Sequence, residues 1–266
     1  MISFYVLSLF PELFETFFNT SIIKKGFEKN AFNYTLKNFR EFAVNNYGQV
    51  DDMPYGGGAG MLLRPEPIFD AYESLNIPEI GKKVLFFSPK GKKIDHKYIL
   101  DLTKLENIVL ICGHYEGVDQ RVLDTLVDEE VSLGDFVLSG GEIPAMALMD
   151  AVIRQLDGVI RKDSLREESF SENLLEYRQY TRPAVYREMA VPEVLTSGNH
   201  KEIEKFKLLD SIRETLKKRP DLFDNPECYR RISEKYQSKE SIESLINKIK
   251  RELNNVSDNK NRTSTY

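Results

Sequence analysis

The sequence contains no tryptophan, two cysteines and three histidines. Two cysteines, Cys112 and Cys228, cannot form a disulfide framework or complete a cysteine-based zinc site, which excludes the small disulfide-rich secreted class. The histidines are too scattered to act together as metal ligands, so no metal site is predicted. No apolar run approaches the ~20 residues that cross a bilayer, and the first residues lack a basic leader and a cleavage site. We therefore expect a cytoplasmic protein without a membrane partner.

Basic residues are scarce in the first part of the chain and more frequent in the second. Residues 1–160 carry 15 Lys and Arg against 23 Asp and Glu, whereas residues 161–266 carry 22 against 19. The second part could therefore meet phosphates, although excess lysine is equally typical of a solvated surface.

Short apolar runs alternate with helical patterns over residues 1–160. Runs at 2–7, 84–87 and 108–112 are typical of buried strands, and the patterns at 95–105 and 142–156 predict helices. This alternation predicts an α/β domain with a mostly parallel sheet. We expect a flexible linker at 161–176, a helical domain at 177–254 and a disordered tail at 255–266.

Three loops concentrate glycine: PYGGGAG at 54–60, CGHYEG at 112–117 and SLGDFVLSGGEIPA at 132–145. The last two follow predicted strands, and ligands of open α/β sheets bind beyond the carboxyl ends of strands. Neither a P-loop nor a G-x-G-x-x-G fingerprint occurs, and the nearest basic residue is Arg121. The loops therefore favour a ligand without phosphates that is held by backbone groups. The alternative is that they are tight turns.

These loops, together with SLFPELF, FFSPKG, ESFSENLLEYRQYTRP and VPEVLTSGNH, are similar to motifs of a known family. The sequence resembles the bacterial tRNA (guanine-N1-)-methyltransferases of the TrmD type, in the SPOUT class, over about residues 1–235. The resemblance implies a mostly parallel sheet with helices on both faces, a deep trefoil knot, and a small all-helical C-terminal domain. It also implies a homodimer with active sites shared between subunits, and it leaves open a dependence on Mg²⁺.

The implied reaction transfers the methyl group of S-adenosylmethionine to N1 of the guanosine immediately 3′ of the tRNA anticodon, which maintains the reading frame. By resemblance, the cofactor contacts are Phe87, Ser88, Pro89, Gly113, Tyr115, Glu116, Gly117, Leu133, Gly134, Phe136, Leu138, Gly140, Gly141 and Pro144.

Guanine N1 carries a proton that a general base must remove, and the negative charge that then develops on O6 favours a nearby cation. The resemblance assigns the base to Glu168, where the family usually has Asp, and the cation to Arg154. For the tRNA phosphates, the basic segment offers Lys201, Lys217, Lys218 and Arg219 as candidates.

The sequence departs from the family's usual residues at Met53, Ala59 and His114. Two other functions remain open: a knotted methyltransferase that acts on a different RNA or on protein, and an RNA-binding module without catalysis. Glu168, Arg154 and the three glycine loops argue against the second.

Overall fold

The computed structural model of this chain describes residues 1–161, 164–165, 168–171, 173–225, 228–229, 232–233 and 242–263. It divides into two compact units, Met1–Lys162 and Asp163–Tyr266, which are described separately below. No helix within the described ranges is both long and apolar enough to cross a membrane.

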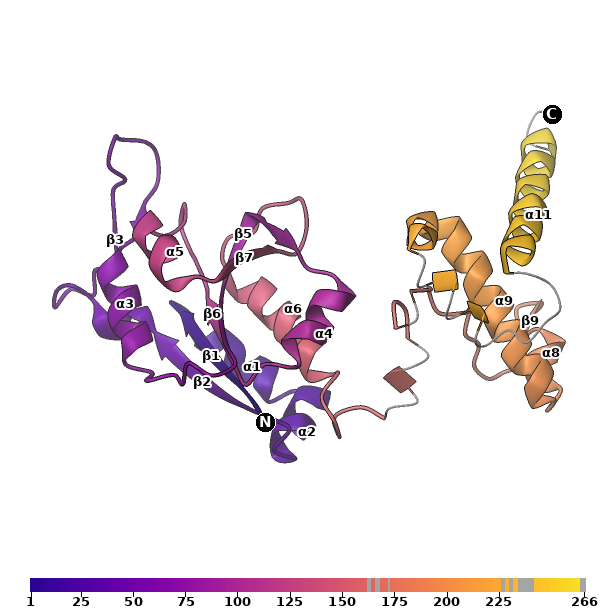
Figure 1. Ribbon diagram of the computed structural model, residues 1–266, viewed down its shortest axis with the longest axis horizontal. Coiled ribbons are helices and arrows are strands. Elements are labelled where there is room, and N and C mark those ends of the chain that lie inside the picture. Colours follow the sequence, from indigo (N-terminus) through magenta and orange to yellow (C-terminus); the bar gives the residue numbers. More distant parts are fainter. Residues whose placement is uncertain are drawn as a thin grey trace. The chain divides into compact units, whose positions relative to one another are not determined.

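The first unit is built on a five-stranded sheet (Figure 1). Its strands are β1 (Ile2–Ser8), β2 (Phe32–Asn38), β5 (Lys82–Lys93), β6 (Asn107–Ile111) and β7 (Glu129–Ser132). The order across the sheet is β2-β1-β6-β5-β7, and every pair of neighbours is parallel. The predicted parallel sheet is therefore confirmed, while the trefoil knot stays a prediction.

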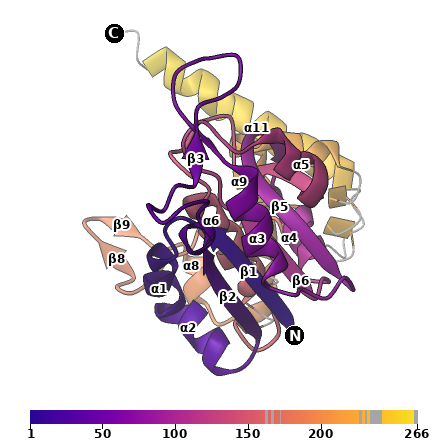
Figure 2. The ribbon, with the colours of Figure 1, turned by 90° about the vertical axis from the view of Figure 1, so that its left-hand side faces the viewer.

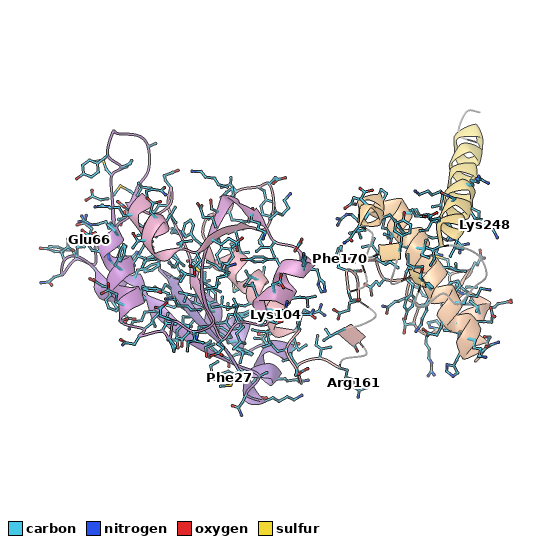
Figure 3. The ribbon with its side chains drawn as sticks, viewed as in Figure 1. Phe27, Glu66, Lys104, Arg161, Phe170 and Lys248 are labelled. Carbon is cyan, nitrogen blue, oxygen red and sulfur yellow. The ribbon has the colours of Figure 1, made fainter. Side chains whose placement is uncertain are left out.

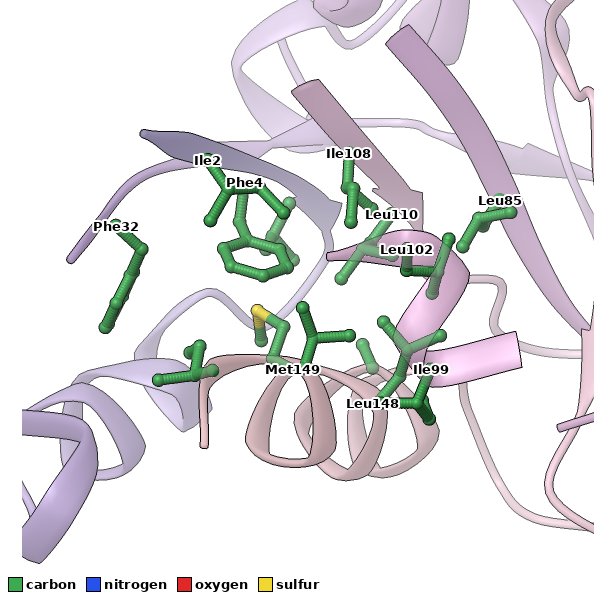
Figure 4. Packing of buried hydrophobic residues seen from close by; sticks show 14 of the residues in the cluster. Ile2, Phe4, Phe32, Leu85, Ile99, Leu102, Ile108, Leu110, Leu148 and Met149 are labelled. Atoms are coloured by element: carbon green, nitrogen blue, oxygen red, sulfur yellow. The ribbon is translucent and has the colours of Figure 1, made fainter. Parts of the chain in front are cut away.

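Side chains alternate between the two faces of this sheet and produce two separate cores. In β6, Ile108 and Leu110 join one core, whereas Val109 and Ile111 join the other. The first core is covered by α1 (Glu12–Phe18), α2 (Ser21–Glu28), α4 (His96–Leu102) and α6 (Glu142–Ile153), as Figure 4 shows in part. The second is covered by η1 (Phe39–Phe42), α3 (Pro65–Glu73) and α5 (Gln120–Leu126), so helices lie on both faces (Figure 2). A small antiparallel pair, β3 (Asp51–Asp52) and β4 (Leu62–Leu63), frames the first glycine loop.

Several elements of this unit differ from the expectation. Strand β5 continues to Lys93 rather than ending at Phe87, because the chain bulges at residues 88–91 and then resumes pairing with β7. The bulge contains Pro89 and Gly91, residues that usually interrupt a strand pattern. Helix α2 contains Gly26, whose low helix propensity concealed it.

The second unit contains a hairpin of β8 (Val185–Tyr186) and β9 (Met189–Ala190), so it is not all-helical as expected. Its helices are α8 (Glu193–Thr196), α9 (His200–Lys218), η2 (Pro220–Asp224) and α11 (Ile242–Thr263). Part of the helical domain predicted at 177–254, residues 226–227, 230–231 and 234–241, lies outside the described residues.

The last helix also corrects the expected disordered tail, because α11 continues to Thr263. Its first half is anchored by Leu245, Ile246 and Ile249, which are buried in this unit's core with Ile212 of α9. Extending an existing helix costs far less than nucleating one, so the polar residues that follow stay helical.

Candidate functional site

A cavity of about 500 Å³ lies beside strands β5, β6 and β7, among the irregular segments that these strands position. It is enclosed by the bulge at 88–91, the loop that follows β6, and the loop between β7 and α6. All fourteen residues predicted as cofactor contacts line it. The structure thus brings together residues from three segments of sequence at the crevice expected for a parallel sheet.

The bulge at 88–91 exists because both Phe87 and Lys92 pair with Val131, which leaves the intervening residues outside the ladder. A Cβ atom on Gly91 would collide with the backbone of Glu130 and Val131. The bulge turns Ser88, Pro89 and Lys90 into the cavity wall.

Close packing against neighbouring atoms, rather than an unusual backbone angle, explains glycine at two other positions of the wall. The φ of Gly141 is −82°, which any residue can adopt. A Cβ atom there would lie 2.6 Å from Cα of Cys112, and a Cβ on Gly113 would lie 2.8 Å from Cζ of Phe86. The Gly141 N–H donates to the Gly113 carbonyl at 2.8 Å, which joins the two loops at the end of β6.

Beneath these loops lies a buried acid. Residue Glu142 is only 4% exposed, and its Oε1 accepts a hydrogen bond from Oγ of Ser8 at 2.7 Å. The Phe10 N–H donates in turn to Ser8 Oγ at 2.9 Å. Glu142 opens α6, where the helix dipole favours a negative charge. The contact therefore fastens the start of α6 to the end of β1.

The ring of His114 lies between Phe10 and Tyr115, with ring centres 5.0 and 5.2 Å away. Within the described residues, its Nδ1 is a buried atom without a hydrogen-bond partner. A Cβ on Gly140 would lie 2.7 Å from this atom. A buried nitrogen on the wall of a cavity needs a bound water or ligand atom as its partner.

The wall chemistry is mixed, with one lysine and no arginine among its residues. Apolar surface comes from Leu133, Leu138 and Pro144, carboxylates from Glu116 and Glu130, and the lysine is Lys90. Glu130, Lys90 and Gln120 were not predicted, because only the cavity geometry places them there. This composition suits a neutral or cationic ligand better than a polyphosphate.

Cys112 lies directly under the glycine loops and is fully buried. Burial, and to a lesser degree the charge of Glu142, raises the pKa of its thiol well above the usual range. It is therefore a neutral packing group rather than a nucleophile.

The two predicted catalytic residues belong to different units. Arg154 is the C-cap of α6 in the first unit, where its N–H donates to the Asp150 carbonyl at 3.0 Å. Glu168 lies in the second unit and is half-buried in a turn, where the Ser171 hydroxyl donates to its carbonyl at 2.7 Å. Its neighbour Glu167 lies outside the described residues.

Three of the four cations predicted to contact tRNA have intramolecular acid partners. Nζ of Lys218 lies 2.6 Å from Glu214, and that of Lys217 lies 4.0 Å from the same carboxylate. The Arg219 guanidinium binds Asp221 at 2.6 and 2.8 Å, with its central carbon 5.7 Å from the Phe170 ring. Lys201 is exposed in the first turn of α9.

One strong ion pair was missed by sequence reasoning. Asp210 is fully buried and accepts hydrogen bonds from the backbone N–H of Arg178 at 2.8 Å and from its Nη2 at 2.6 Å. Burial alone would raise the pKa of this carboxyl, but the Arg178 contacts outweigh it and hold the pKa below its usual range. Only the fold brings these residues together.

The family model described as tRNA (Guanine-1)-methyltransferase TrmD matches residues 2–225 of this chain. The chain belongs to this family. It is 48% identical over 223 residues to the tRNA (guanine-N(1)-)-methyltransferase of Bacillus subtilis, covering 83% of this chain and 92% of the relative. The protein of the same name from Staphylococcus aureus strain JH9 is 46% identical over 219 residues, covering 82% of this chain and 89% of the relative. The segments that line the cavity lie within the residues that the family model matches.

Proposed function

We propose that this chain transfers the methyl group of S-adenosylmethionine to N1 of the guanosine immediately 3′ of the tRNA anticodon, and so maintains the reading frame. The observation that carries the proposal is the family membership, since the matched relatives are named tRNA (guanine-N(1)-)-methyltransferases. The cavity supports it independently, because its walls suit a ligand without phosphates.

The residues at the cavity fit S-adenosylmethionine as the methyl donor. Gly113, Gly140 and Gly141 line the cavity without side chains of their own, and the apolar walls suit a purine ring. Glu116 and Glu130 favour a ligand that carries positive charge. When bound, the donor supplies an electrophilic methyl group on a sulfonium.

The chain's own contribution to the chemistry is to prepare guanine as a nucleophile. The Glu168 carboxylate would accept the N1 proton, an effect typically worth ~10²–10⁴-fold in rate. Arg154 would stabilise the negative charge that moves onto O6. For Mg²⁺, the described residues include no group of three or more acidic, histidine or cysteine side chains placed to hold a metal ion, and we assign it no step.

We further propose that the protein works as a homodimer. Two features support this: the base and the cavity lie in different units, and an apolar groove runs between α1, α2 and α6. The groove is lined by Leu13, Phe17, Ile22 and Met146, and Leu13 is 49% exposed. A second copy of the chain would cover this surface.

One experiment tests both the reaction and the base. The protein is incubated with labelled S-adenosylmethionine and unmodified tRNA, and the methylated nucleotide is mapped. Methylation at N1 of the guanosine 3′ of the anticodon is expected, and label at another nucleotide or none would contradict the proposal.

In the same assay, Glu168→Gln should lower the single-turnover rate by roughly 10²-fold or more, because the amide cannot accept a proton. Affinity for the donor and for tRNA should be retained, and Glu168→Asp should keep much of the activity. Glu167→Gln is the matched control. If it is the inactive variant instead, the base is Glu167.

A further inference from the structure

Helix α11 lies entirely beyond residues 2–225, which the family model matches. It nevertheless packs against the core of the second unit (Figure 1). Leu245, Ile246 and Ile249 are each at most 5% exposed and share a core with Ile212 of α9. The helix is therefore a fixed part of this unit and can hold the side chains of its other faces in defined positions.

An ion pair adds to this anchoring. Nη2 of Arg213, on α9, lies 3.2 Å from Oε2 of Glu252 on α11. The faces turned away from the core expose Lys248, Lys250 and Arg251 (Figure 3 labels Lys248). Lys248 and Arg251 are three residues apart and so are neighbours on the helix surface.

These three cations differ from the predicted tRNA contacts at the end of α9. Within the described residues, no ion pair engages Lys248, Lys250 or Arg251. Glu252, the acid one turn beyond Lys248, is paired with Arg213 instead. Lys218 and Arg219, in contrast, each lie 2.6 Å from a carboxylate of their own chain. A phosphate must compete with that carboxylate at the end of α9, whereas on α11 it displaces only water and counterions.

We propose that Lys248, Lys250 and Arg251 form a phosphate-binding surface for tRNA, which α11 adds to the part of the chain shared with the family. The inference rests on the proposed function, from which the partner is taken. Contacts to phosphate carry no base information, so this surface should set affinity and its salt dependence. It should not change which nucleotide is methylated.

The test is the triple variant Lys248→Gln, Lys250→Gln, Arg251→Gln in the full chain. Binding of unmodified tRNA is measured over a series of salt concentrations. Each lost phosphate contact should reduce the slope of log K against log salt by about 0.7–0.9, so the triple variant should lose roughly two units or more. At physiological salt, its Kd for tRNA should rise on the order of tenfold or more.

Two further variants separate this effect from folding and from general electrostatics. Lys248→Arg, Lys250→Arg, Arg251→Lys keeps the charges and should keep the wild-type slope. Lys24→Gln, Lys97→Gln, Lys104→Gln removes the same charge from the first unit and should leave the slope nearly unchanged. Affinity for S-adenosylmethionine and the methylation rate at saturating tRNA should be equal in all variants.

A wild-type slope in the Gln triple variant would overturn the inference, as would an equal loss of slope in the first-unit variant. Either result would leave the proposed function intact if the wild-type protein methylates tRNA. A wild-type protein that binds tRNA through α11 but never methylates it would instead contradict the proposed function and support the surface.

Discussion

At the scale of single residues, the glycines of the cavity have different reasons for being glycine. Gly117 has a φ of +135°, a region that other residues rarely adopt. Gly141 has an ordinary φ but no room for a side chain, because the backbone of Cys112 and Gly113, directly after β6, lies behind it. Gly134 also lacks room, but its neighbour is the ring of Phe136, which is 55% exposed and can turn away.

This difference predicts a graded effect of adding one methyl group. Gly141→Ala should weaken binding of S-adenosylmethionine by roughly tenfold or more, because the Cβ would lie 2.6 Å from Cys112 Cα and backbone must move. Gly134→Ala is the matched control and should cost much less, since only a side chain must shift. Calorimetry with the methyl donor measures both. Equal affinities for the two variants would contradict the close-packing explanation.

The cavity residues could be predicted because they lie in short segments whose motifs resemble those of the family. The sequence could not reveal that Nδ1 of His114 is buried without a partner among the described residues, which depends on the packing of Phe10 and Gly140. Nor could it reveal that Lys218 faces Glu214. Such pairings depend on side-chain positions in space, which residue types and spacing leave undetermined.

At the scale of elements, the segment at residues 175–178 is fixed to α9 by two polar contacts. The Leu175 N–H donates to Thr215 Oγ1 at 2.9 Å, and Arg178 binds the buried Asp210. Both acceptors are on α9 and are fully buried. The segment therefore depends on side chains of the helix rather than on a sheet for its position.

The Asp210 contact predicts a pH-dependent stability. The pKa of Asp210 is lower in the folded state than its ordinary value of about 3.9, so its stabilisation is complete above that pH and is lost as pH falls through the folded pKa. Asp210→Asn should lower the free energy of unfolding by about 2 kcal/mol at neutral pH, less than for a wholly buried pair because Arg178 is half exposed.

Chemical denaturation of both proteins between neutral and acidic pH measures this difference. It should begin to shrink once the pH falls below about 3.9, where Asp210 of the unfolded chain takes up a proton, and it should be lost as the pH falls through the lower pKa of the folded state. A difference that stays constant down to low pH would show that the charge of Asp210 is not the cause.

Strong periodicity predicted the elements that form the centre of the first unit, including β1, β6 and α6. The elements that were missed have weak local signals. Strands β8 and β9 have two residues each. The tail was misjudged because its polar residues are held helical by the apolar contacts of the preceding turns.

At the scale of the whole molecule, the proposed base and the cavity belong to separately packed units. Glu168 follows the boundary at residue 163, and the cavity lies wholly within Met1–Lys162. The proposed homodimer would allow the base of one copy to serve the cavity of the other.

Mixing two inactive proteins tests this arrangement. One carries a bulky substitution at Gly141, and the other carries Glu168→Gln. After subunit exchange, half of the dimers are mixed and each has one complete site, so the activity should recover to about one quarter of wild type. No recovery, together with a monomer in light scattering, would contradict the shared site.

The order of strands in the sheet has a consequence for the synthesis of the protein on the ribosome. Strand β1 pairs on one side with β2 and on the other with β6, where Ser3 lies opposite Asn107. At roughly 5–20 residues per second, a ribosome needs several seconds to make the chain that separates β2 from β6. During that interval the side of β1 that later pairs with β6 exposes a row of unpaired backbone groups, as an edge strand does. The nascent chain is therefore most vulnerable to aggregation before β6 leaves the exit tunnel.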